Sequence, residues 1–141
     1  MSIPFIKNPK TSVKCLVLKT NHITCKIIIN GVEGNFLIDS GASNSCIDIT
    51  SDERFKLEKY KKSYSASGAG NGKFDVSKSK KAQISHLGKN IVKLNFLLID
   101  MESINKALNE SDNISVDGIL GADFLIKKNA LISYKTMTLS F

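Results

Sequence analysis

The chain has 141 residues, 42% of them hydrophobic, and a formal net charge of +7 with a pI near 9.3. This length fits one domain with a real core, and no apolar run approaches the roughly 20 residues that a membrane span needs. Residues 1–5 lack the charged-then-apolar pattern of a signal peptide, so we expect a soluble, cytoplasmic protein that does not enter a membrane.

The positive charge makes nucleic-acid binding a competing function class. Lysines cluster at residues 59–62, 78–81 and 127–128, but the chain has no tryptophan and these clusters lack the interleaved aromatic residues of a stacking platform. A solvated, lysine-rich face explains the charge better. We therefore expect no nucleic-acid partner.

The chain contains three cysteines, Cys15, Cys25 and Cys46, which form no close pair along the sequence. An odd number of separated cysteines indicates neither a disulfide framework nor a zinc site. We interpret all three as small buried thiols in a reducing compartment, and we expect neither a metal nor a cofactor.

Residues 12–29 are predicted to form a β-hairpin. The second half alternates Ile23, Cys25, Ile27 and Ile29 with polar residues, which is the two-residue period of a strand with one buried face. Asn30 and Gly31 then supply a tight turn into the apolar run at residues 36–38.

That apolar run leads directly into Asp39, Ser40 and Gly41. Apolar flanks predict that the turn is held inside the protein, where an unpaired carboxylate is costly unless it is needed. The alternative is an ordinary surface turn, since Asp, Ser and Gly are common turn residues. A second motif far along the chain decides against that alternative.

Between the two motifs the pattern is mostly extended. A polar loop at residues 43–45 precedes an apolar strand at 46–49, and residues 50–53 form a capping box, with Thr50 and Glu53 satisfying amides of a short helical turn. Residues 60–79 are predicted to be a hairpin with a glycine-rich tip. A phosphate-binding loop is the other function of glycine clusters, but no lysine followed by serine or threonine opens a helix here.

Strands follow at residues 80–84 and 90–98 around a turn at 87–89, and residues 102–109 have helical composition. The second motif, residues 116–125, is a short apolar strand that closes on Gly121 and runs into a helix at residues 122–128. The tail, residues 136–141, alternates as a strand and needs a partner, either its own sheet or a second chain.

Together the two motifs resemble the retropepsin-like aspartic proteases, single-domain enzymes that work as homodimers. In that family a turn with two apolar residues, Asp, Ser or Thr, Gly and Ala carries the catalytic carboxylate, and a later Ile-Leu-Gly strand crosses behind it; residues 37–42 and 119–121 match in this order. The resemblance implies an all-β fold, a retropepsin-like acid-protease barrel with one short helix near the C-terminus. Residues 1–141 would form one domain, with a flap hairpin at about residues 60–79.

The resemblance also implies an aspartic endopeptidase, in which Asp39 of each subunit contributes to a dyad that activates water, with a peptide or protein as substrate. The residues that would support the active-site loop are Ser40, Gly41 and Ala42. The flap residues that would contact substrate are Ser67, Gly68, Ala69, Gly70, Asn71 and Gly72. The second-motif strand comprises Ile119, Leu120 and Gly121.

The chain departs from many viral members of that family in two places. Ser43 and Asn44 stand where those members have acidic residues, and Ala122 stands where they have an arginine, so neutral hydrogen bonds would replace an ion pair. The chain therefore looks closer to cellular and bacterial-type retropepsins. Two alternatives remain: a catalytically silent retropepsin-fold module that binds or dimerises, and a basic β-barrel that binds nucleic acid.

Overall fold

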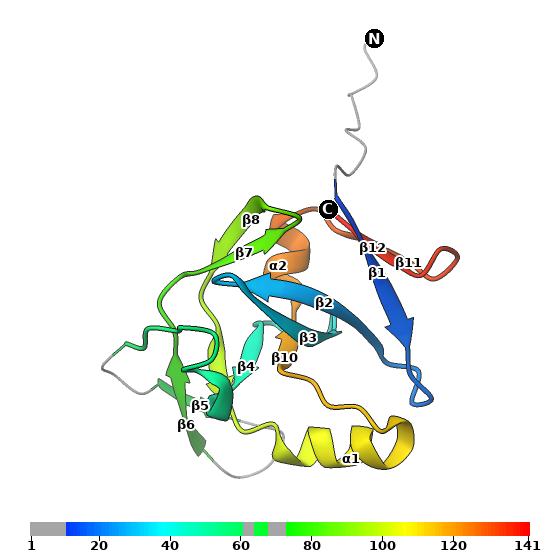
Figure 1. Ribbon diagram of the computed structural model, residues 1–141. Coiled ribbons are helices and arrows are strands. Elements are labelled where there is room, and N and C mark those ends of the chain that lie inside the picture. The colour runs from blue at the N-terminus through cyan, green and yellow to red at the C-terminus, as the bar shows by residue number, and fades with distance from the viewer. Residues whose placement is uncertain (1–10, 61–63, 68–72) are drawn as a thin grey trace.

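The computed structural model describes residues 11–60, 64–67 and 73–141, and most of its regular structure is β-sheet (Figure 1). The strands are β1 (Ser12–Val17), β2 (Ile23–Ile29), β3 (Val32–Ile38), β4 (Cys46–Asp48), β5 (Tyr64–Ser67), β6 (Lys73–Lys78), β7 (Ala82–His86), β8 (Lys89–Leu94), β9 (Leu97–Ile99), β10 (Gly118–Leu120), β11 (Leu131–Ser133) and β12 (Thr138–Ser140). The helices are η1 (Ile49–Ser51), a 3-10 turn, and the α-helices α1 (Glu102–Asp112) and α2 (Ala122–Lys127).

The strands form one 12-stranded sheet in the order β11-β12-β1-β2-β3-β10-β4-β9-β6-β5, with β7 and β8 branching from β2. Within the described residues the end strands β11 and β5 do not pair with each other, so the sheet is not closed into the predicted acid-protease barrel. The reason lies in β2, which pairs along one edge with β1 through Ile23–Cys25 and with β7 through Ile28 and Ile29. Because β1 and β7 pair with different parts of the same edge of β2, the sheet branches there instead of closing.

The predicted first hairpin is confirmed. β1 and β2 are antiparallel, and the side chains of Ile23, Cys25, Ile27 and Ile29 are buried. The turn from β2 to β3 has positive φ at both central residues, 49° at Asn30 and 81° at Gly31. This backbone matches the twist of the two strands that it joins, and Asn-Gly adopts it readily.

Strand β10 lies between β3, to which it is parallel, and β4, to which it is antiparallel. Its first residue must be glycine, because a Cβ on Gly118 would lie 2.1 Å from the carbonyl oxygen of Cys46 and 2.7 Å from the ring of Phe36. The second motif therefore crosses directly beside the strand that leads to Asp39, as the family resemblance implies.

The predicted capping box is wrong. The 3-10 turn begins earlier, and the Asp48 carboxylate caps it by accepting the Thr50 N–H at 3.3 Å. Asp48 is the last residue of β4 and the N-cap of the 3-10 turn, so its carboxylate occupies the capping position. Thr50 lies inside the turn and is not at its N-cap.

Both predicted helical segments are present. α1 covers a small apolar cluster through Leu108 and Ile104, and it ends at Asn113 with φ of 55°, the left-handed conformation typical of a helix end. α2 matches the short helix predicted near the C-terminus, and Asn129 after it also has positive φ.

The tail folds onto its own chain. β12 lies between β1 and β11, and the backbone groups of Thr11 and Phe141 exchange two hydrogen bonds of 3.0 and 2.9 Å. The ring of Phe141 meets that of Phe124 in α2 edge to face, with centroids 5.2 Å apart. Both edges of the tail strand are thus paired within the chain, which decides between the two partners left open above.

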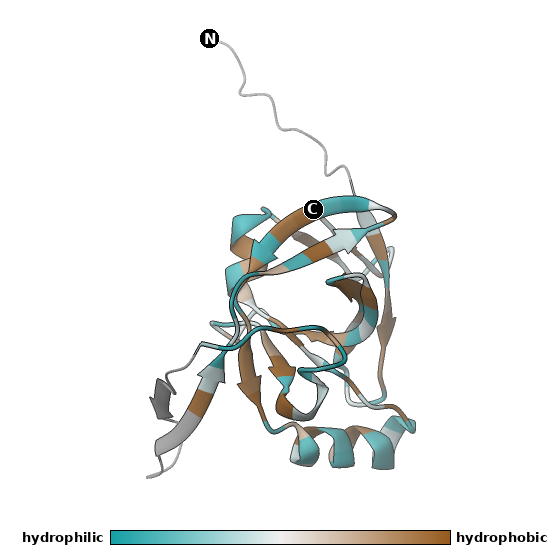
Figure 2. Ribbon diagram, turned by 60° about the vertical axis from the view of Figure 1, so that its left-hand side comes forward, coloured by the Kyte–Doolittle hydropathy of each residue, from teal (hydrophilic) through white to brown (hydrophobic). Residues whose placement is uncertain are grey.

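Hydrophobic residues occupy the central strands, while the outer face of α1 is mostly polar (Figure 2). The larger core cluster includes the ring of Phe55, which lies 6.2 Å from that of Phe36 and packs where Gly34 leaves room. Among the described residues no helix is both long and apolar enough to cross a membrane.

Candidate active site

The Asp39 turn begins where β3 ends and is tied to the crossing strand. The Asp39 N–H donates to the carbonyl of Leu120 at 3.0 Å, and the Ala42 N–H closes the turn on the Asp39 carbonyl at 3.2 Å. The preceding strand is buried through Ile38, but Asp39, Ser40 and Gly41 are exposed. The turn is therefore exposed in this chain and not held inside it as predicted, because the apolar run stops one residue before the carboxylate.

The Asp39 carboxylate accepts one hydrogen bond from the protein, as far as the described chain extends. Its Oδ1 accepts the N–H of Gly41 at 2.8 Å. A Cβ on Gly41 would lie 3.1 Å from the same oxygen, so glycine lets the amide approach. A carboxylate offers about four lone-pair sites, and most of those on Asp39 remain available to water or a ligand.

The second glycine lies directly against the turn. The Ala122 N–H donates to the Ala42 carbonyl at 2.7 Å, and a Cβ on Gly121 would lie 2.6 Å from that carbonyl oxygen. The structure thus brings together the predicted groups at Asp39, Ala42 and Gly121. The neutral hydrogen bond between the two loops that the sequence predicts is the one from Ala122 to Ala42.

A second, charged connection was missed. Ser45 is fully buried, and the carboxylate of Asp123 accepts its N–H at 3.0 Å and its hydroxyl at 2.7 Å. The Ser45 hydroxyl oxygen in turn accepts the Gly121 N–H at 2.9 Å. Asp123 also accepts the N–H of Phe124 at 2.8 Å. Hydrogen bonds to an ionised acceptor are stronger than neutral ones, so this network fastens the loop after Asp39 to α2.

The sequence carries half of the signal for this network. An acidic residue in the first turn of a helix is favourable and Asp123 is recognisable as one. Its partner Ser45 is 78 residues earlier, inside a stretch that reads as an ordinary polar loop. No local pattern indicates that this serine is buried.

Asp117 stands at the opposite end of β10. Its carboxylate accepts the Asn35 N–H at 2.8 Å and forms an ion pair with Arg54. The two acidic residues nearest Gly121 in sequence, Asp117 and Asp123, are thus both engaged in bonds that hold the loops. Within the described chain no three His, Cys, Asp or Glu side chains gather as a metal site.

The predicted flap lies partly outside the described residues. β5 and β6 are antiparallel, with Ser67 opposite Lys73, and β6 continues to pair with β9 (Figure 1). The tip residues Gly68, Ala69, Gly70, Asn71 and Gly72 are not described.

A shallow groove of about 440 Å³ lies beside the Asp39 turn. It runs from Ser40 to α2 and the residues after it, and Ile126 in its wall is 75% exposed. Leu125 and Ala130 line the same groove, so its wall beside Ser40 is partly apolar.

The comparisons agree with this geometry. The aspartyl protease family matches residues 23–124. EIAV protease, solved in complex with the inhibitor HBY-793, is 26% identical, with 78% of this chain and 90% of that chain covered and a TM-score of 0.55. No curated protein matches this sequence.

Two further solved structures share the fold. The retroviral protease-like domain of Ddi1 from Leishmania major is 20% identical, covering 84% of this chain and 86% of that one, with a TM-score of 0.57. A retropepsin-like aspartic protease from Rickettsia conorii is 15% identical, covering 96% of both chains, with a TM-score of 0.53.

Proposed function

This chain belongs to the retropepsin-like aspartic proteases, and from that premise we propose that it is an aspartic endopeptidase whose active site is shared by two identical subunits. The observation that carries the proposal is the Asp39 carboxylate, which is exposed and accepts a protein hydrogen bond from Gly41 alone among the described groups. The backbone of that turn is nevertheless fixed by β10. A firmly placed carboxylate with free lone pairs is suited to proton transfer.

Peptide hydrolysis at such a site needs two carboxylates that share one proton. One Asp39, ionised, takes a proton from the attacking water; the other, protonated, gives its proton to the carbonyl oxygen of the substrate. No covalent intermediate forms. Each chain has one matching Asp-Ser-Gly motif, so the second carboxylate comes from the partner subunit across a two-fold axis.

The surface beside the turn supports a partner there. Ser40 is exposed, and its hydroxyl would donate a hydrogen bond across the axis, while Ile126 in the adjacent groove would be covered by the same partner. Burying one such aliphatic side chain contributes roughly 1.5–3 kcal/mol. The tail strand is paired on both edges within its own chain, so we do not place the interface there.

The β5–β6 hairpin is proposed as the flap. Its glycine-rich tip, which includes Gly70, would close over the bound peptide, exclude water and offer backbone hydrogen bonds. A peptide or protein is the substrate that this arrangement accommodates. EIAV protease, which is similar over most of its length, is described with a bound inhibitor.

Dilution tests the shared site. Specific activity on a peptide library should fall as the protein is diluted through its dimer dissociation constant, because a monomer has half of a dyad. Ile126→Asp should move that fall to higher protein concentration. A species that sedimentation shows to be monomeric, with full activity per chain, would refute the shared dyad.

Subunit mixing separates the remaining functions. An excess of Asp39→Asn chains, exchanged with wild-type chains, should suppress cleavage beyond simple dilution by forming heterodimers with one carboxylate. A folded dimer that cleaves no peptide at any pH would instead support the silent binding module. Salt-sensitive binding of single-stranded nucleic acid, without cleavage, would support the basic nucleic-acid-binding alternative.

A further inference from the structure

Cys15 on β1 and Cys25 on β2 are direct partners across the first hairpin, although ten positions separate them in sequence. The hydrogen-bond pattern identifies the type of pair. Leu18 donates its N–H to His22, so the hydrogen-bonded pairs fall at alternate positions, and Cys15 directs its own N–H away from β2, to Met137. Cys15 and Cys25 are therefore a non-hydrogen-bonded pair, whose Cα atoms approach to about 4.5 Å and whose side chains lie on one face.

This geometry is compatible with a disulfide. Disulfide-bonded cysteines have Cα atoms roughly 4.4–6.8 Å apart, and the cross-strand pair lies near the short end of that range. Cβ atoms in non-hydrogen-bonded pairs lie at the short end of about 4.5–5.5 Å, against roughly 3.5–4.5 Å in a disulfide, so bond formation requires a slight approach of the two strands. A bond under this mild strain would be readily reduced again, as expected of a reversible site.

The two thiols differ in their surroundings. Cys15 is half-buried, whereas Cys25 is 3% exposed and belongs to the core. The interaction between the two thiols lowers the pKa of Cys15, against the opposing effect of burial, and the Leu139 backbone lowers it further. The same interaction, together with burial, raises the pKa of Cys25. Cys15, the less buried of the two, is therefore the thiol that an oxidant from solvent meets first.

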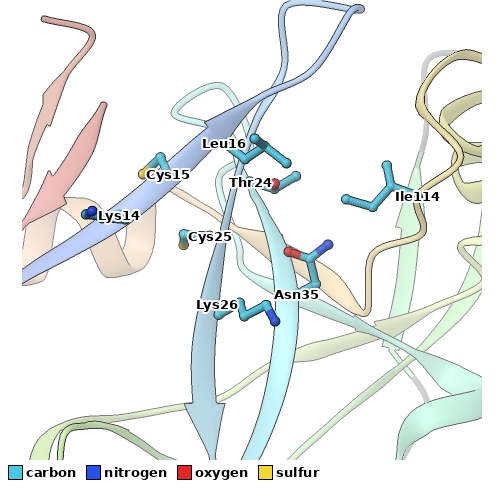
Figure 3. A pocket seen from close by; sticks show the side chains of 8 residues that line it. All are labelled: Lys14, Cys15, Leu16, Thr24, Cys25, Lys26, Asn35 and Ile114. Carbon is cyan, nitrogen blue, oxygen red and sulfur yellow. The ribbon is translucent and has the colours of Figure 1, made fainter. Parts of the chain in front are cut away.

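Figure 3 shows which way the two sulfurs point. The side chains of Leu16 and Thr24 point with Ile114 to one side of the β1–β2 ribbon, and the two cysteines point to the other. Both cysteines also pack with the core cluster, Cys25 as a member and Cys15 against it, while they line the same groove as Ile114. Cys15 is half-buried and lines this groove, and hydrogen peroxide is a small oxidant suited to such a position.

We propose that Cys15 and Cys25 form a reversible oxidation site that reacts with hydrogen peroxide and closes to an intrachain disulfide. The Cys15 thiolate attacks one peroxide oxygen, the O–O bond breaks, and sulfenic acid and hydroxide form. The Cys25 sulfur then attacks the Cys15 sulfur, the S–O bond breaks, and its thiol proton leaves with the hydroxyl group as water. Overall two thiols are oxidised by two electrons and one peroxide is reduced to two waters. Excess thiol reverses the bond by exchange.

The disulfide would join the two strands of the first hairpin covalently. β1 is also held by β12, while Cys25 pairs on its other side with Phe36 in β3. The disulfide would therefore link β1, which pairs with the tail strand β12, to β2, which pairs with β3, the strand that leads to Asp39. This inference does not depend on the proposed proteolytic activity, since no step uses Asp39.

Peptide mapping tests the proposal on the folded full chain. Trypsin cleaves after Lys14, Lys19 and Lys26, so Cys15 and Cys25 fall in different peptides, residues 15–19 and 20–26, and Cys46 falls in a third. After peroxide treatment we expect the first two peptides linked, with two hydrogens lost and Cys46 still free. The melting temperature should rise and return to its starting value with dithiothreitol. Cys46→Ala should form the same link between the two peptides, with the same reversible rise in melting temperature.

Two variants identify the order of the steps. In Cys25→Ser, Cys15 should accumulate as sulfenic acid that a dimedone-type reagent traps, at a rate about tenfold above that of Cys46. In Cys15→Ser, Cys25 should remain reduced. Mixing isotope-labelled and unlabelled chains before oxidation shows whether the link is within one chain. Links between chains, equal oxidation of Cys46, or Cys15 and Cys25 that stay reduced in the folded protein but oxidise after unfolding would each overturn the proposal.

Discussion

Asp39 and Asp123 both lie close to the end of β10, but they differ in exposure and in the number of hydrogen bonds that they accept. Asp39 is exposed and accepts one N–H, from Gly41, whereas Asp123 is half-buried and accepts the Ser45 amide, the Ser45 hydroxyl and the Phe124 amide. The difference is one of unused capacity. A carboxylate whose lone pairs are occupied by the protein holds structure, while one with free lone pairs can exchange a proton with water or substrate.

Both carboxylates sit at the ends of elements that fix their backbone. Asp39 is fastened through its N–H to Leu120, and Asp123 begins α2 directly after Gly121. Position alone therefore does not distinguish the two roles. The comparison predicts that substitutions at Asp39 affect chemistry and substitutions at Asp123 affect stability first.

The largest effect is expected from Asp39→Asn. An amide cannot act as general base or acid, so the rate of peptide cleavage should fall by about three orders of magnitude or more. The melting temperature should stay within a degree or two of wild type, because the amide oxygen can still accept the Gly41 N–H. Undiminished cleavage by the folded variant would remove Asp39 from the mechanism.

Asp123→Ala should reverse that pattern. It leaves the N–H and hydroxyl of buried Ser45 without their acceptor, at a cost of about 3 kcal/mol in the free energy of unfolding. Urea denaturation measures this cost, with Asp39→Ala as the matched control, expected within about 0.5 kcal/mol of wild type. Equal stability of the two variants would show that the Asp123 network does not hold the loop.

Ser45→Ala should lower the free energy of unfolding by less, about 2 kcal/mol. It leaves the buried Gly121 N–H without its acceptor but keeps the hydrogen bond from the backbone N–H of residue 45 to the Asp123 carboxylate. Ser43→Ala, at an exposed position two residues earlier, is the control and should change stability very little. If both variants unfolded at the same urea concentration, the Ser45 hydroxyl would have no structural role.

These residues also mark how far the sequence could be interpreted. The first hairpin and the strand before Asp39 follow from local patterns, because apolar period and glycine position act over a few residues. The crossing at Gly121 was expected from the family resemblance and not from periodicity. The bond from Asp123 to Ser45 joins positions 78 residues apart and leaves no local trace. The exposure of Asp39 was not predicted for a related reason. An apolar run indicates that its own residues are buried, but it says nothing about the burial of the turn that follows.

The open sheet was missed in the same way. Periodicity predicts which residues form β2, but the sharing of its edge by β1 and β7 depends on where distant strands dock. The pairing of Cys15 with Cys25 is the intermediate case. The hairpin was predicted, yet the register that makes the two thiols partners depends on the turn between them.

The smallest effect is expected at Cys46, whose thiol senses both carboxylates. Burial raises its pKa from an ordinary value of 9.0 to about 11, with smaller contributions from the charges of Asp123 and Asp39. The folded state thus favours the thiol, so this contribution to stability is complete below pH 9 and is lost as the pH rises towards 11. Cys46→Ala should flatten that part of the stability profile and leave the profile at neutral pH unaltered in shape.

In a background with Cys15 and Cys25 replaced by serine, ultraviolet titration of the remaining thiolate should show a slightly lower pKa of Cys46 after Asp39→Asn, because one repelling charge is gone. An unchanged or raised pKa would mean that Asp39 is too well solvated for its charge to reach the buried thiol, which would limit how far the exposed turn influences the interior.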